Sequence, residues 1–154
     1  MPSYIKKLHS RRRFLSHLSL ILSLPLSLPL LSSSAHAKTE LWQKRLKQIV
    51  QDIKPIEGRV SIELPAIATH GNLVPITISV VSPMSEQDYV QSITLISNRN
   101  KTPELAEFQF SPLSGKAECS TTLRLEENQE IMALAKMNDG KLYIGRRQAK
   151  INIS

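Results

Sequence analysis

The chain has 154 residues, with 20 Lys and Arg, 13 Asp and Glu, four His and one Cys. A single Cys excludes an internal disulfide, and with so few His we expect no typical zinc or copper site. The formal net charge of +7 comes largely from residues 1–37, which hold five of the basic residues and no acid. The charge therefore gives no argument for nucleic-acid binding.

The first 37 residues have the composition of an export signal. A basic segment precedes an apolar stretch, residues 18–31, which Pro25 and Pro29 interrupt. The small residues Ala35 and Ala37 follow, a spacing typical of cleavage after Ala37. A membrane anchor needs about 20 apolar residues. We therefore predict a cleaved signal peptide, residues 1–37, over its alternative, a retained anchor.

Within this leader, the segment Ser10-Arg11-Arg12-Arg13-Phe14-Leu15 matches the twin-arginine pattern S-R-R-x-F-L. The alternative is an ordinary basic leader. The candidate export-signal residues are Arg11, Arg12, Phe14 and Leu15. The twin-arginine pathway exports proteins that have already folded, so the pattern predicts a folded protein in the periplasm.

Residues 38–57 are predicted to form an amphipathic helix. Thr39 is the candidate N-cap, and Pro55 and Gly58 are expected to end the helix. The apolar positions that share one helical face are Trp42, Leu46, Ile49, Val50 and Ile53. We expect this face to pack on the protein's own sheet, the alternatives being a membrane or a partner surface.

Residues 58–154 are predicted to form an all-β antiparallel sandwich, because short apolar runs alternate with turn residues. The expected strands are residues 59–68, 73–81, 90–97, 104–111, 116–125, 130–137 and 141–153. Asp139-Gly140 predicts a two-residue type I′ turn between the last two. Pro65 and Pro75 fall inside expected strands, so each is predicted at a sheet edge or a bulge.

Cys119 alternates with apolar residues of its strand, which predicts that it faces the core. Burial would raise the pKa of its thiol, so a structural role is favoured over a reactive nucleophile. His70 lies in the turn-forming segment His70-Gly71-Asn72 and is interpreted as a solvent-exposed loop residue, not a catalytic one. Without a recognisable catalytic, phosphate-binding or metal motif, we expect a non-enzymatic protein with no cofactor.

Segments throughout the mature chain carry a resemblance to a known family. They are Met84-Ser85-Glu86-Gln87-Asp88-Tyr89-Val90, Ser92-Ile93, Phe110-Ser111-Pro112, Ser114-Gly115-Lys116-Ala117, Leu123-Arg124-Leu125, Met137, Asp139-Gly140 and Leu142-Tyr143. The leader, the amphipathic helix and Leu64-Pro65-Ala66-Ile67-Ala68 fit the same pattern. Together they resemble SoxY, the sulfur-carrier subunit of the bacterial Sox thiosulfate-oxidation system.

The resemblance implies an immunoglobulin-like sandwich that pairs with SoxZ, a partner that lacks its own leader. In the family, the last strand continues into a mobile Gly-Gly-Cys-Gly-Gly tail, whose cysteine carries sulfur intermediates between periplasmic enzymes. Here residues 149–154 correspond to the last strand, and the sequence ends at Ser154 without such a tail. Cys119 is in mid-strand and is not expected to replace a swinging thiol.

Three interpretations of this resemblance remain open. The protein is a SoxY-like subunit that pairs and docks with a SoxZ-like protein, a true carrier cut short at Ser154, or an unrelated exported sandwich that binds another periplasmic protein. The first is favoured. A different class is an enzyme subunit, an accessory binding module or an electron-transfer module that acts beside a periplasmic quinoprotein dehydrogenase. No interpretation involves nucleic acid, or a membrane after cleavage.

Overall fold

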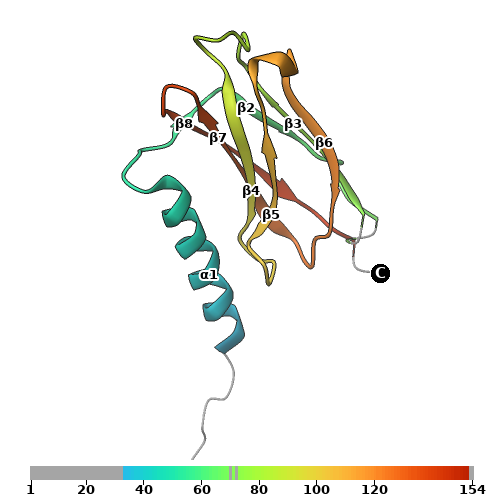
Figure 1. Cartoon of the computed structure of the whole chain (residues 1–154). Helices are drawn as coiled ribbons and strands as arrows, with labels where there is room; N and C mark the ends of the chain where they lie inside the picture. Colours follow the sequence, from blue (N-terminus) through green and yellow to red (C-terminus); the bar gives the residue numbers. More distant parts are fainter. Residues whose placement is uncertain (1–32, 70, 72, 153–154) are drawn as a thin grey trace, which may run out of the picture. The chain divides into compact units, whose positions relative to one another are not determined.

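Eight strands, one α-helix and one short 3-10 helix make up the described part of the protein (Figure 1). The computed structural model describes residues 33–69, 71 and 73–152, all within one unit, residues 31–154. The elements are α1 (Ser33–Val50), β1 (Ile56–Glu57), β2 (Val60–Glu63), β3 (Val74–Val80), β4 (Val90–Ser97), β5 (Glu104–Gln109), η1 (Pro112–Ser114), β6 (Ala117–Leu123), β7 (Gln129–Met137) and β8 (Leu142–Ala149).

The strands form two sheets. One has five strands in the order β1-β8-β7-β4-β5, and the other has three in the order β2-β3-β6. The pairs are antiparallel except for β1 with β8 and an isolated bridge between Ala68 and Ile151, which are parallel. The predicted all-β sandwich is confirmed, with β1 as an additional strand of two residues.

The main core lies between the two sheets. In β3, Val74, Ile76, Ile78 and Val80 are buried and alternate with more exposed residues, as the sequence pattern predicts. The strands β4 and β7 instead contain nearly continuous buried runs. Such runs are typical of strands that are covered on both faces, here by the sandwich core and by α1.

The helix α1 packs on the outer face of the five-stranded sheet. Its side chains Trp42, Leu46, Ile49 and Val50 cover a buried cluster on this face, made of Ile96, Met132, Leu134, Leu142 and Ile144. An ion pair between Arg45 and Glu104 of β5 joins the helix to the sheet. Among the described residues, no helix is both long enough and apolar enough to cross a membrane.

The predicted ends of this helix were wrong at both termini. The helix begins at Ser33, so Thr39 is inside the helix and is not its N-cap. It ends at Val50, because Gln51 adopts a left-handed conformation with φ 49° that terminates the helix before Pro55. Ile53 therefore lies beyond the helical face on which it was predicted. Cleavage after Ala37 would remove the first residues of α1.

The prediction of a two-residue type I′ turn between the last two strands was wrong. Residues 138–141 connect β7 to β8, and the turn between Met137 and Lys141 contains three residues, Asn138-Asp139-Gly140. In this turn Gly140 has φ 83° and Asp139 does not have positive φ. Gly140 N–H donates to Met137 O, and Met137 N–H to Lys141 O, so the turn is not type I′ but is followed by a glycine bulge.

Pro65 lies after the end of β2, so the predicted strand over residues 59–68 is shorter than expected. Pro75 lies in β3, the central strand of its sheet, opposite Thr122 of β6. The β2 ladder ends at Glu63 opposite Thr77, so β3 has a ladder neighbour on only one side at Pro75. Val81 N–H donates to Arg59 O on the β2 side, so by alternation the nitrogen of Pro75 also faces that side, where the ladder has ended and needs no donor.

Candidate functional site

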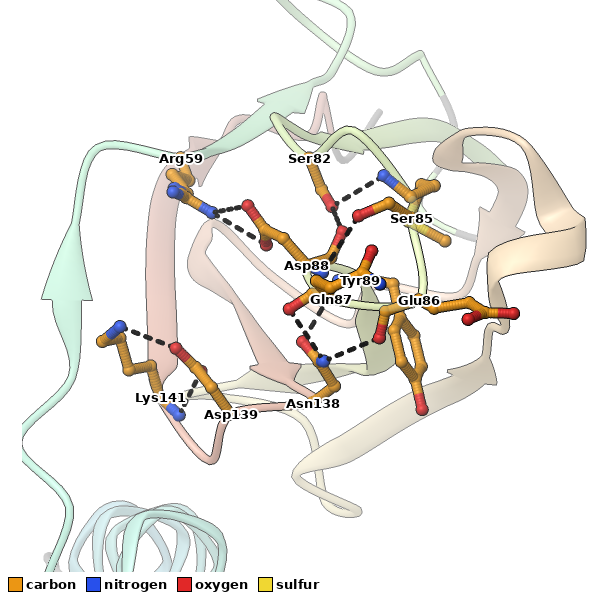
Figure 2. Close-up of polar contacts among 11 residues, drawn as sticks. Arg59, Ser82, Ser85, Glu86, Gln87, Asp88, Tyr89, Asn138, Asp139 and Lys141 are labelled. Carbon is orange, nitrogen blue, oxygen red and sulfur yellow. Dashed lines mark hydrogen bonds and ion pairs between the residues drawn. The ribbon is translucent and has the colours of Figure 1, made fainter.

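One end of the sandwich, which we call the loop end, carries the β3–β4 loop, residues 81–89, and the β7–β8 turn, residues 138–140. Hydrogen bonds within the β3–β4 loop fix its shape (Figure 2). The Ser82 hydroxyl donates to Asp88 O at 3.1 Å and accepts from Met84 N–H at 3.2 Å. The Ser85 hydroxyl accepts from Asp88 N–H at 3.1 Å. Met84 has φ 51°, and its side chain is buried in the main core, which anchors the loop.

Asn138 clamps this loop to the β7–β8 turn. Its side-chain NH₂ donates to Gln87 O at 3.1 Å and to Glu86 O at 3.4 Å, while its Oδ1 accepts from Tyr89 N–H at 3.1 Å (Figure 2). The Asn138 backbone N–H also donates to Tyr89 O. One side chain therefore joins two segments that are about fifty residues apart in the sequence.

Arg59 supports the same loop from the start of β2. Its guanidinium lies 3.4 Å from the Asp88 carboxylate and 5.0 Å from the centroid of the Tyr143 ring. A guanidinium can pair with a carboxylate and stack on an aromatic face at once, so Arg59 connects the loop to β8.

Asp139 and Lys141 form a separate exposed ion pair at 2.6 Å beside Asn138. The hydrogen bond from the Lys141 ammonium lowers the pKa of the Asp139 carboxyl, and the same bond raises the pKa of Lys141. Both residues are solvent-exposed, so we interpret the pair as part of the turn and not as an acid–base couple.

The loop end has the properties of a binding surface. Its loops are held by side-chain hydrogen bonds, and it presents the exposed polar residues Glu86 and Gln87. It also exposes two apolar residues, Val81 at 75% and Leu113 of η1 at 98%. A fixed backbone with exposed apolar and polar groups can bind a partner at a low cost in conformational entropy.

The structure places Cys119 on β6, opposite Ile78 of β3, with its side chain partly buried against the main core. Burial raises the pKa of the thiol from 9.0 to about 11, and the neighbouring Glu118 carboxylate adds to the shift. A thiol with this pKa is almost entirely protonated at neutral pH, which makes it a poor nucleophile.

The opposite end of the sandwich, which we call the exit end, is where β8 finishes. Ala68 N–H donates to Lys150 O at 2.9 Å, and Asn152 N–H donates to Ala68 O at 2.8 Å. Ile151 N–H donates to the Asn128 side chain at 2.7 Å. The backbone is therefore bonded on two sides as far as Asn152.

A buried polar network closes the exit end. The Gln129 NH₂ donates to Asn100 Oδ1 at 2.9 Å, the Asn100 NH₂ donates to Arg124 O at 2.8 Å, and Ser97 donates to Gln129 Oε1. Ser97, Asn100 and Gln129 are each at most 8% exposed. Their mutual bonds satisfy polar groups that would otherwise be costly to bury.

Among the described residues, a groove of about 590 Å³ lies between α1 and the outer face of β4, β5 and β7, and its polar lining includes Arg45, Glu107 and Lys136. Another groove, of about 380 Å³, lies between β5 and β6 near the exit end and is lined partly by Lys101 and Arg124. Cys119 lines neither groove.

Most of the remaining sequence-predicted site residues fall in parts of the chain that the structure does not describe. Arg11, Arg12, Phe14, Leu15 and His70 lie outside the described residues, whereas Ala35 and Ala37 lie in α1. Within residues 33–69, 71 and 73–152, no group of three or more His, Cys, Asp or Glu side chains is arranged to hold a metal ion.

Sequence reasoning missed the roles of Asn138 and Arg59. Asp139-Gly140 was interpreted only as a turn, and no local pattern indicates that the amide of the preceding Asn138 contacts the β3–β4 loop.

Comparison with known families gives one match over most of the chain. The sequence profile of the family described as "Sulfur oxidation protein SoxY" matches residues 46–154, which include the end of α1 and all eight strands. No individually curated protein matches the chain significantly.

Solved structures with a similar arrangement include superoxide reductases. The superoxide reductase (neelaredoxin) from Ignicoccus hospitalis is 20% identical with a TM-score of 0.55, over 62% of this chain and 81% of that one. The superoxide reductase from Nanoarchaeum equitans is 17% identical with a TM-score of 0.53, over 62% of this chain and 98% of that one. At such identities the likeness shows a shared fold alone.

Proposed function

Because the chain belongs to the SoxY family of sulfur oxidation proteins, we propose that it is a SoxY-like subunit of periplasmic thiosulfate oxidation that acts by binding other proteins. The observation that carries this proposal is the family match, which spans the whole sandwich. The fixed loop end, with its exposed Val81 and Leu113, supports a binding role. The family likeness favours a non-enzymatic subunit.

The chemistry of Cys119 supports binding over covalent sulfur transport by this residue. Oxidative attachment of thiosulfate to a thiol releases one proton and two electrons, so it needs a thiolate and an external electron acceptor. With a pKa of about 11, roughly one Cys119 thiol in ten thousand is ionised at pH 7. Cys119 also lies in the middle of a paired strand, so it cannot swing into the active site of a partner enzyme.

Mass spectrometry of the intact protein tests this assignment. The native protein is incubated with thiosulfate and an oxidised c-type cytochrome as electron acceptor, beside a Cys119→Ala control. We expect an unchanged mass in both samples. A gain of one thiosulfate on the native protein, absent from the control, would show that Cys119 is a carrier.

The partner that we propose is a SoxZ-like sandwich without its own leader. Co-expression should give a stable 1:1 complex, which would bury on the order of 1,200 Å² or more. Size-exclusion chromatography at micromolar concentration measures this. Separate elution of the two proteins would contradict the pairing.

The proposed location is the periplasm, reached by the twin-arginine pathway. The double variant Arg11→Lys and Arg12→Lys should leave precursor in the cytoplasm, because lysine keeps the charge but lacks the planar guanidinium. Cell fractionation with an antibody to the protein measures the distribution. Normal periplasmic accumulation of the double variant would refute this route.

A further inference from the structure

Among the four sheet edges, β6 is the longest uninterrupted one. β1 and β2, the edges beside β8 and β3, have two and four residues. β5, the other edge of the five-stranded sheet, has a register irregularity against β4 and follows Pro103. β6 pairs with β3 over seven residues without a register shift and contains no proline. Exposed edges of this kind are where strands of another chain add to a sheet.

The hydrogen bonds around β6 show which of its residues direct their backbone groups outward. Leu125 N–H donates to Gly71 O, on the side of β3. Arg124 O accepts from Asn100, on the opposite side. Because residues along a strand alternate in this respect, the N–H and C=O groups of Glu118, Ser120 and Thr122 point away from β3. β6 has no sheet neighbour there among the described residues.

The main core is also incompletely covered along this side. Ile76 and Ile78 on β3, the strand next to β6, are at most 1% exposed. Ala117 and Leu123, at the two ends of β6, are buried, but several residues of β5 and the middle of β6 that pack against the same core are only partly buried. They are Leu105, Ala106, Phe108 and Cys119, with Phe110 just beyond β5. A further strand along β6 would cover apolar surface as well as backbone groups.

The residues of β6 are complementary to a second copy of β6. In an antiparallel pair with a two-fold axis at Thr121, Glu118 lies opposite Arg124 of the other copy, and Ser120 opposite Thr122. The two-fold axis repeats each contact. The side chains of Glu118 and Arg124 are both exposed on the outer face of the sheet. The Arg124 carbonyl is already bonded to Asn100, so these two residues face each other through their side chains and the backbone ladder is limited to Ser120 and Thr122. Opposite charges stabilise directly facing positions, and like charges destabilise them.

Neighbouring registers that keep the same backbone bonding are less favourable. With the axis at Ser120, Lys116 would face Arg124. With the axis at Thr122, Glu118 would face Glu126. Each places two like charges opposite each other, twice by symmetry. The charges on β6 and beside it thus favour the register with the axis at Thr121 for a pair of two copies.

We propose that β6 forms an antiparallel pair with β6 of a second copy of this chain, with the two-fold axis at Thr121. The two three-stranded sheets then become one six-stranded sheet. The outward N–H and C=O groups of Ser120 and Thr122 bond across the interface. This interface is independent of the SoxZ-like partner proposed above and does not require it.

Charge reversal tests the interface in solution. Sedimentation velocity of the full chain, from about 1 µM to about 0.5 mM, covers the affinities of weak specific dimers. The native protein should form a dimer. Glu118→Arg and Arg124→Glu should each weaken it by about tenfold or more, since each converts two attractive contacts into repulsive ones.

The combined variant Glu118→Arg with Arg124→Glu should restore dimerisation to within about threefold of the native affinity, because it exchanges the two charges. The matched control is Glu63→Arg on β2, the other edge of the same sheet, which should leave the dimer unchanged. A monomeric native protein at every concentration would overturn the proposal. So would single variants and a combined variant that behave like the control.

Disulfide trapping tests the register. Thr121→Cys in a Cys119→Ala background should form a linked dimer on mild oxidation, because facing non-hydrogen-bonded residues have Cα atoms about 4.5 Å apart. The native chain is the control, since its Cys119 thiols would lie four residues apart, or about 13 Å. Efficient linking of the native chain but not of the variant would refute this register.

A different occupant would also be detected. If the Thr121→Cys variant cross-links to a co-expressed SoxZ-like protein while the isolated chain stays monomeric, the β6 edge belongs to the hetero-complex and the second-copy proposal is wrong. That outcome would leave the proposed function intact.

Discussion

Cys119 illustrates how the position of one residue in a strand sets its chemistry. The strand register pairs it with Ile78 and turns its thiol toward the main core. Burial disfavours the thiolate, and the adjacent Glu118 carboxylate disfavours it further, which together raise the pKa to about 11. The sequence pattern predicted that the thiol faces the core and that its pKa is raised, because the alternation of side chains along a strand depends only on neighbouring residues.

The raised pKa of Cys119 predicts how stability depends on pH. The unfolded thiol ionises near 9.0 and the folded thiol near 11, so the folded state favours the protonated form. The stability that the protonated thiol gives to the folded state is fully present below pH 9 and is lost as pH rises through 11. Urea unfolding at several pH values should show the native protein losing stability relative to Cys119→Ala across this window. A constant difference between the two proteins would contradict the prediction.

Gly145 and Gly140 should tolerate alanine differently. A Cβ at Gly145 of β8 would lie 2.8 Å from Val60 O of β2, so Gly145→Ala must separate two backbones and should cost about 2 kcal/mol or more. At Gly140, a Cβ meets no atom within 4 Å, but φ is 83°, so Gly140→Ala should cost about 1 kcal/mol. Thermal or urea unfolding measures both. Equal costs would show that β2 can move away from β8.

At the scale of the elements, the exit end depends on side chains that bond between loops. Gln129 begins β7 and is 3% exposed, and it bonds Asn100 and Ser97. Gln129→Leu should destabilise the protein by about 2 kcal/mol, because it leaves buried polar groups without partners. The matched control is Gln148→Leu on the exposed part of β8, for which we expect little change in the urea midpoint. Similar losses for both variants would contradict a structural role of the network.

The strands could be predicted from the sequence more accurately than the connections between them. The apolar residues of β3 occupy every second position, which predicts one buried and one exposed face, as observed for Val74, Ile76, Ile78 and Val80. The end of α1 depends on the left-handed conformation of Gln51, a residue with no marked preference for it, so sequence rules placed the end at Pro55. The β7–β8 turn was wrong because Asp139-Gly140 suits more than one loop length.

The candidate site was predictable only in part. The β3–β4 loop was recognised from its resemblance to a family, whereas its attachment was not. Asn138 bonds Glu86, Gln87 and Tyr89, and Arg59 pairs with Asp88. These contacts join residues distant in the sequence, and periodicity describes only neighbours along one strand.

For the whole molecule, the five-stranded sheet separates two apolar clusters. The cluster between the sheets contains residues of β2, β3, β4, β6 and β7, whereas the cluster beneath α1 is closed by partly buried residues of the helix. We therefore expect the helix to separate from the sheet at times while the sandwich remains folded. The linker that follows α1, residues 51–55, consists of residues outside any helix or strand.

This separation should give backbone amides two distinct lifetimes in deuterated water. Amides of β4 and β7 exchange only on global unfolding, while those of α1 exchange when the helix alone opens. Trp42→Ala should accelerate the exchange of α1 amides without affecting the two central strands, which hydrogen-exchange mass spectrometry can resolve. Equal acceleration in all three elements would mean that helix and sandwich unfold together. If the two lifetimes differ, a small fraction of the folded molecules exposes the outer face of β7 to the solvent at any moment.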